Sequence, residues 1–238
     1  MASSGLFFTV LYQPLFNALI FLYNSLGGDL GLAVIVLTAI LRLALWPWYQ
    51  SNSRSQRAMT KVQSLVSDIQ KQYKGDQPKQ TQEMMRIYKE NKIQPFGMIL
   101  FMVVQFILLW GMFKIFQGVF DGKMFAWLYP FVQQPEVLNN MFLGFLDLSK
   151  PYIIMAVIVT VFQFLQTKIS LSNNQVKDKT AKMTQNITLY VMPILIFVIY
   201  LKLPSILALY WMVMSLIGFV QELLVKKQFE KETLKLKA

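Results

Sequence analysis

The sequence predicts an all-α membrane protein with five transmembrane helices, an N-terminal interfacial helix and a cytoplasmic helical hairpin. Of its 238 residues, 55% are hydrophobic and only 15% are charged. Several apolar runs reach the length of about 20 residues that a helix needs to cross a bilayer. The net charge of +11 is concentrated in the segments between and after these runs. This composition is typical of polytopic helical membrane proteins.

The residue types that are missing exclude several kinds of chemistry. The chain contains no Cys and no His, so disulfides, Cys/His metal or haem sites and Ser/His or Cys/His catalytic pairs are excluded. We expect no cofactor, no metal site and no enzymatic reaction. The first 41 residues contain no Lys or Arg, so we also expect no cleaved signal peptide, which would begin with a positive segment.

Residues 1–27 are predicted to form an interfacial amphipathic helix. At 100° per residue, Gln13, Asn17 and Asn24 fall within about 40° of one another and make one polar stripe on an otherwise apolar helix. Pro14 interrupts the apolar run. A sixth membrane span is the alternative, because the segment is nearly long enough to cross.

Residues 28–48 form the predicted first span, and the apolar run inside it carries one full charge, Arg42. Trp46 and Trp48 stand where aromatic residues line a membrane–water interface. At 1.5 Å per residue, Arg42 lies roughly 9 Å inside that edge. An ionisable group in the bilayer is costly, which favours a functional role. The alternative is that Arg42 faces lipid and its long side chain reaches out to the headgroups.

Residues 49–94 are predicted to form a helical hairpin in the cytosol. This segment holds nine Lys and Arg against four Asp and Glu, and KGDQP at 74–78 signals a turn. Weak apolar periodicity on each side of the turn indicates two helices. The periodic positions are Val62, Leu65, Val66 and Ile69 before the turn and Met84, Met85, Ile87 and Tyr88 after it.

The predicted segments that follow are a second span at 95–117, an external loop at 118–150, a third span at 151–171, a cytoplasmic loop at 172–185, a fourth span at 186–203, a fifth span at 204–225 and a basic cytoplasmic tail at 226–238. Basic residues gather in the hairpin, in the loop at 172–185 and in the tail. Because basic loops stay in the cytosol, the N-terminus is expected outside and the C-terminus inside.

Polar side chains within the spans cluster in the cytosolic halves, and the candidates are Gln105, Thr160, Gln163 and Gln166. Such groups can simply hydrogen-bond between helices. Arg42 is harder to accommodate in this way, because we expect no intramembrane carboxylate to pair with it. The hypothesis is therefore a water-filled groove, open to the cytosol and closed to the outside, with Arg42 on its wall.

Further stretches match the sequence pattern of a known family. They are EMMRIYKE at 83–90 followed by Pro95 and Gln105, FLGFLDL at 142–148, and LP at 203–204 followed by LYW at 209–211 and Gln221. In this order and spacing, over about residues 12–225, the chain resembles the YidC/Oxa1/Alb3 membrane protein insertases. It departs from the family at Phe106, where Pro is frequent, at Ser215, where Asn is common, and at Lys202, where an apolar residue is usual.

The resemblance implies a minimal bacterial insertase of the inner (plasma) membrane that works without ATP. Arg42 matches the groove arginine of the family, and Trp211 and Ser215 would also belong to the groove. The implied partners are nascent membrane proteins and the lipid bilayer, with the Sec translocon and the ribosome as further candidates and no dedicated nucleic-acid site. The polar tail of a client would enter the groove, which would shorten its path through hydrocarbon.

Two other kinds of protein remain open on sequence grounds. A small transporter or channel would use intramembrane ionisable relays or inverted repeats, and we identify no repeat. A non-catalytic membrane scaffold would need no particular residue.

Overall fold

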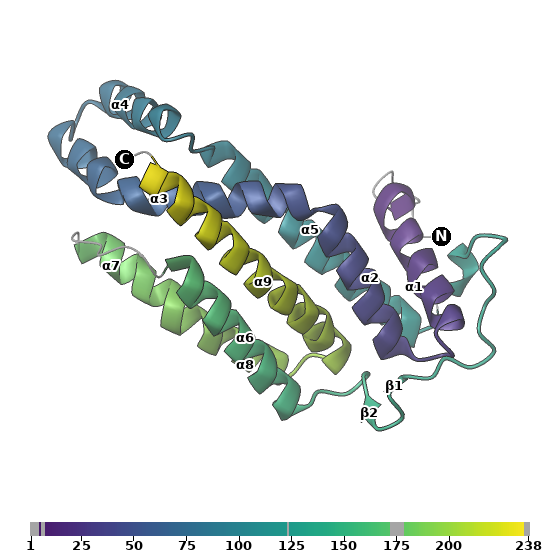
Figure 1. The fold of residues 1–238 in the computed structure, drawn as a ribbon. Coiled ribbons are helices and arrows are strands. Elements are labelled where there is room, and N and C mark those ends of the chain that lie inside the picture. The colour runs from purple at the N-terminus through teal and green to yellow at the C-terminus, as the bar shows by residue number, and fades with distance from the viewer. Residues whose placement is uncertain (1–4, 6–7, 123, 172–178, 236–238) are drawn as a thin grey trace. The chain divides into compact units, whose positions relative to one another are not determined.

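The computed structural model describes residues 5, 8–122, 124–171 and 179–235, and it is predominantly helical (Figure 1). Within these residues, three helices are long and apolar enough to cross a membrane: α5 (Pro95–Phe120), α6 (Ile153–Leu171) and the Ser205–Gln228 part of α9. A fourth exists if α2 (Leu30–Ala44) and the start of α3 form one broken span. The prediction of a multi-pass helical membrane protein is confirmed, and the count of five spans stays a prediction.

The chain divides into two compact units. The described residues of Met1–Ala44, Val104–Thr160 and Ile196–Ile217 form the first unit, and those of Leu45–Val103, Val161–Leu195 and Gly218–Ala238 form the second. α5, α6 and α9 each contribute to both units.

In the first unit, a short π-helical segment (Phe8–Tyr12) leads into α1 (Gln13–Ser25), which packs on α2 through a buried apolar face. The predicted polar stripe of α1 hydrogen-bonds to the backbone of the segment after α5. Gln13 and Asn17 both donate to the carbonyl of Trp127, at 3.1 Å each. Asn24 donates to the carbonyl of Gln133 at 2.7 Å. The stripe therefore holds a loop, and the interfacial position of residues 1–27 stays a prediction.

The predicted external loop contains a 3-10 turn (Phe125–Trp127) and a small antiparallel pair, β1 (Met141–Phe142) and β2 (Leu146–Asp147). Asp29 fixes this pair to α2, because Oδ1 accepts from the Leu32 amide (2.9 Å) and Oδ2 from the Leu143 amide (2.7 Å). A side chain on Gly31 would overlap the Phe142 ring, since an added Cβ would lie 2.1 Å from it. Glycine is therefore required where β1 meets α2.

The turn after β2 meets the start of α9 (Ser205–Lys235). The amides of Ser205 and Ile206 donate to the carbonyls of Lys150 and Leu148, at 2.9 and 3.1 Å. Hydrogen bonds from the side chains of Lys150 and Ser149 lower the pKa of Asp147 to about 2. Asp147 therefore stays ionised at neutral pH and keeps its 2.8 Å ion pair with Lys150.

The predicted first span is two helices. α2 ends at Ala44, Leu45 breaks the helix, and α3 (Trp46–Gln72) begins with Pro47 in its first turn. Proline has no amide proton and its ring obstructs a preceding turn, so it favours a new helix start over a continuous helix. The structure therefore places a helix break at Leu45, inside the predicted first span, and the span over 28–48 itself stays a prediction.

In the second unit, α3 and α4 (Gln77–Glu90) pack together through an apolar core. Its buried members are Val62, Val66, Ile69, Ile87, Tyr88 and Ile93. Leu65 and Met85, which also fit the periodicity, are 50% and 42% exposed and lie outside the core. Gly75, with φ of 103°, and the Asp76 cap of α4 form the predicted turn. Burial raises the pKa of the Tyr88 hydroxyl.

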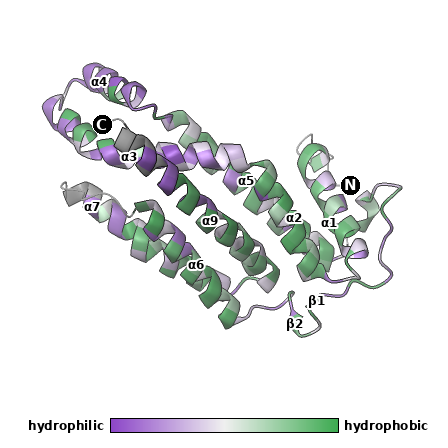
Figure 2. Ribbon diagram, in the orientation of Figure 1, coloured by the Kyte–Doolittle hydropathy of each residue, from purple (hydrophilic) through white to green (hydrophobic). Residues whose placement is uncertain are grey.

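The last helices differ from their predicted bounds. α7 (Lys179–Asn186) leads through a π-helical segment (Ile187–Val191) into α8 (Met192–Tyr200), so the apolar helix of the predicted fourth span covers only Ile187–Tyr200. α9 continues to Lys235, which makes most of the predicted tail helical. Figure 2 shows its change from hydrophobic to hydrophilic along its length. Residues 1–4, 6–7, 123, 172–178 and 236–238 of the predicted segments lie outside the described residues.

Candidate functional site

Arg42 lies in the last turn of α2, on the side that this helix buries. Val34, Thr38 and Arg42 follow one another at four-residue intervals and share one face. Arg42 is 6% exposed, whereas Ile40 and Leu43, on other sides of the helix, are 52% and 59% exposed. The lipid-facing alternative is therefore wrong. A cation at this position is also stabilised by the C-terminal end of the helix dipole.

The first unit contains five of the seven predicted groove residues: Arg42, Gln105, Thr160, Trp211 and Ser215. Gln105 is half-buried on α5, and Ser215 is buried on α9. The hydroxyl of Thr160 donates to the Ala156 carbonyl of its own helix at 2.8 Å. The second unit contains Gln163 and Gln166, both half-buried on α6. Their common groove remains a prediction.

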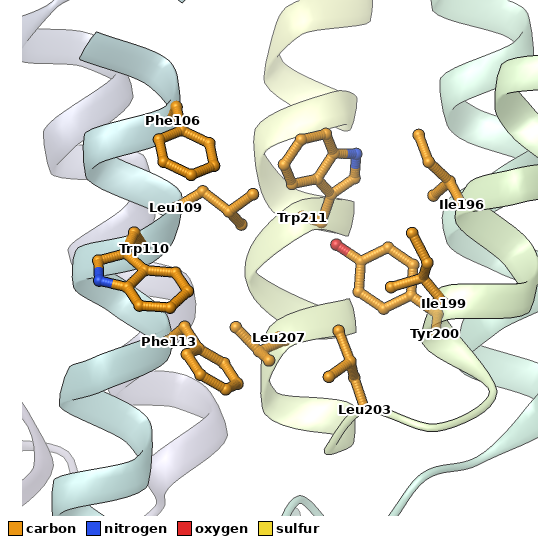
Figure 3. Close-up of a pocket in the computed structure, with 10 residues that line it drawn as sticks. All are labelled: Phe106, Leu109, Trp110, Phe113, Ile196, Ile199, Tyr200, Leu203, Leu207 and Trp211. Atoms are coloured by element: carbon orange, nitrogen blue, oxygen red, sulfur yellow. The ribbon is translucent and has the colours of Figure 1, made fainter. Parts of the chain in front are cut away.

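Trp211 lines a cavity of about 280 Å³ that we call the apolar slot (Figure 3). Its wall includes Phe106, Trp110 and Phe113 of α5, Leu207 and Trp211 of α9, and Tyr200 at the end of α8. No residue that lines the slot is charged. In the structure, Trp211 therefore faces apolar side chains across the slot, a surface for hydrocarbon.

The second unit contains a buried ion pair that the sequence analysis missed. Arg57 Nη2 of α3 lies 2.6 Å from Glu222 Oε2 of α9, and the two side chains are 6% and 9% exposed. The Ser53 hydroxyl donates to Oε1 of the same carboxylate, and Arg57 also donates to the Ile169 carbonyl of α6 at 3.3 Å. This Arg57–Glu222 cluster ties three helices together.

Glu222 overturns the expectation that the spans supply no carboxylate. It lies within the predicted fifth span, and its partner Arg57 belongs to the segment predicted to be a hairpin in water. Its neighbour Gln221, which is 2% exposed, donates to the Trp46 carbonyl at 2.9 Å. The sequence signal that could have revealed this ion pair is the carboxylate of Glu222 near the end of an apolar run, because a charge buried there requires a partner.

A second overlooked charge is Lys114, inside the predicted second span. It is exposed on α5, and its ammonium lies 5.3 Å from the centre of the Trp110 ring. A cation over an indole face is favourable, and more so away from water. Arg42 is therefore not the only full charge within the predicted spans.

The described residues offer little for covalent chemistry. No group of three or more Asp or Glu side chains in the described part of the chain is arranged to hold a metal ion. The polar groups that are brought together donate and accept hydrogen bonds or form ion pairs.

Comparison with known proteins identifies similar sequences over nearly the whole chain. The family model described as 60Kd inner membrane protein matches residues 21–232. The chain is 28% identical over 234 residues to "Membrane protein insertase YidC 1" of Listeria monocytogenes, covering 97% of this chain and 75% of that protein. It is 30% identical over 231 residues to "Membrane protein insertase YidC" of Oceanobacillus iheyensis, covering 94% and 85%.

A solved structure is also similar, described as "Active YidC insertase crystal structure with the first transmembrane domain resolved". The TM-score is 0.55 at 25% sequence identity, covering 88% of this chain and 46% of that chain. The chain thus spans most of the length of the two bacterial relatives and about half of the solved protein.

Proposed function

The chain belongs to the YidC/Oxa1/Alb3 family of membrane protein insertases, and on this premise we infer that it inserts membrane proteins and helps them to fold. Its clients are nascent membrane proteins, and it acts as a multi-pass protein of the inner membrane. Insertion moves a segment between environments and requires no bond to be made or broken. The Sec translocon and the ribosome are further proposed partners.

The proposed topology has five spans, with the N-terminus outside and the C-terminus in the cytosol. Support comes from three helices of sufficient length and from the apolar α2 and Ile187–Tyr200 helices, which are too short to pass the same test alone. Basic residues on α3 and α4 favour a cytosolic position for this pair. Residues 1–27 would lie along the outer interface.

The proposed mechanism places a hydrated groove in the cytosolic half of the membrane, formed by Arg42, Gln105, Thr160, Gln163, Gln166, Trp211 and Ser215. The observation that carries this proposal is the position of Arg42, which the helix buries although it lies in an apolar segment. An ionisable group so placed is costly and points to a function. Arg42 would attract an acidic client tail, and the amides would replace part of its hydration.

Crosslinking of nascent single-spanning clients tests this function. A photoreactive residue at Gln105, Gln163 or Met212 is expected to crosslink to a client arrested during insertion. The matched control is Val137, which is 81% exposed in the segment between α5 and α6 and should give no crosslink. Absence of crosslinks at all three probe positions, with insertion proceeding, would exclude the groove as the client route.

A further inference from the structure

The apolar slot has a buried wall and an exposed mouth. Leu207 and Tyr200 are 2% and 6% exposed, whereas Phe106, Trp110 and Ile199 are 64%, 47% and 45% exposed. Figure 3 shows the α5 side chains on one side of the slot and those of α8 and α9 on the other. Exposed apolar residues of a membrane helix meet lipid hydrocarbon, so the mouth opens to acyl chains.

A cation contacts one of the rings that line this slot. Lys114 follows Phe113 in the chain, and its ammonium contacts the ring of Trp110 at 5.3 Å. It lies six residues before Phe120, the last residue of α5, or roughly 9 Å from that end of the helix. A flexible lysine stem can bring its ammonium from this depth to the headgroup region.

We propose that the slot binds one acyl chain of an anionic phospholipid and that Lys114 attracts its phosphate. An empty apolar cavity loses dispersion contacts that an acyl chain would supply. Lipid is the molecule that surrounds the mouth in the membrane, and a positive charge at the edge selects an anionic headgroup. The slot thus supplies shape and Lys114 supplies charge selectivity, in the leaflet at the C-terminal end of α5.

This site needs neither Arg42 nor the amides of the proposed groove, but it shares Trp211 with that groove. An apolar client helix would compete for the same mouth but would show no preference for an anionic headgroup. Headgroup selectivity therefore distinguishes the two occupants.

Quenching of tryptophan fluorescence by brominated acyl chains tests the proposal, since Trp110 and Trp211 both line the slot. The purified full chain is placed in phosphatidylcholine vesicles that contain the same small fraction of either brominated phosphatidylglycerol or brominated phosphatidylcholine. We expect brominated phosphatidylglycerol to quench as strongly as if its concentration at the slot were about fivefold higher than in the bulk membrane. This factor corresponds to the attraction of one lysine for anionic lipid, which is worth about 1 kcal/mol. Lys114→Gln should abolish this preference.

Lys168→Gln is the matched control, because Lys168 lies 6.0 Å from the ring of Phe164 on another membrane helix and does not line the slot. It should keep the preference. Ile199→Phe, which fills the exposed mouth, should reduce quenching by both lipids. Equal quenching by the two lipids in the unsubstituted protein, or an unchanged preference in Lys114→Gln, would overturn the proposal.

Discussion

Replacing Glu222 by alanine is expected to destabilise the protein by about 3–5 kcal/mol. The substitution leaves the Arg57 guanidinium buried without its counter-ion, and an uncompensated buried charge is far more costly than a lost surface pair. Ser53 also loses its acceptor. The free energy of unfolding should be measured by reversible denaturation in mixed micelles.

The paired variant separates loss of the ion pair from loss of packing. Replacing both residues, as Arg57→Met with Glu222→Leu, should return stability to within about 1–2 kcal/mol of the parent, because neither charge is then left alone. Arg86→Ala is the control: its side chain is 65% exposed and its 2.8 Å pair with Glu83 is worth about 0–1 kcal/mol. If Glu222→Ala behaves like Arg86→Ala, the Arg57–Glu222 cluster is not stabilising.

Replacing Arg42 by alanine should reduce insertion of clients with acidic translocated tails about fivefold to tenfold. That factor corresponds to a free energy of roughly 1–1.4 kcal/mol. Most exposed ion pairs supply less, but the guanidinium of Arg42 is buried, where its attraction for a carboxylate is stronger. Arg42→Lys should retain most of the activity, since it keeps the charge. The measurement uses the protein reconstituted in vesicles and determines the fraction of client molecules that become inserted, seen as protection from protease added outside the vesicles.

Clients with neutral tails show whether the effect of Arg42→Ala depends on the charge of the client. The Arg86→Ala variant shows whether losing any one positive charge from the protein has the same effect. Insertion of neutral-tailed clients should change little, and Arg86→Ala should insert both kinds of client normally. An equal loss for acidic and neutral tails would mean that Arg42 maintains the structure. No loss for either kind would remove the electrostatic role.

Local sequence signals predicted the features that depend on neighbouring residues. The KGDQP turn, the apolar faces of α3 and α4 and the polar stripe of α1 were found because spacing along one helix determines which side chains share a face. The fifth span was predicted to end at 225 because hydropathy falls after that residue, whereas α9 continues because no helix-breaking residue stops the backbone there. Hydropathy reports the membrane boundary and not the helix boundary.

Partners distant in sequence were not predictable in this way. Arg57 and Glu222 are separated by 165 residues, and each looked like an ordinary charge beside an apolar run. Lys114 was hidden because its strongly apolar neighbours dominate any average over the predicted second span. The partners of the α1 stripe are backbone carbonyls, which every residue carries, so side-chain identity could not indicate them.

Labelling from the aqueous phase is the sharpest test of a hydrated groove beside Arg42. The chain has no Cys, so single cysteines at Gln105 and Gln163 can be labelled without background by a membrane-impermeant maleimide. Leu165, which is 38% exposed and lies two residues from Gln163 on α6, is the lipid-facing control, and exposed Lys89 on α4 is the positive control. We expect labelling at 105, 163 and 89 from the cytosolic side and none at 165. Labelling at 89 alone would show that no water reaches this part of the membrane and would contradict the account.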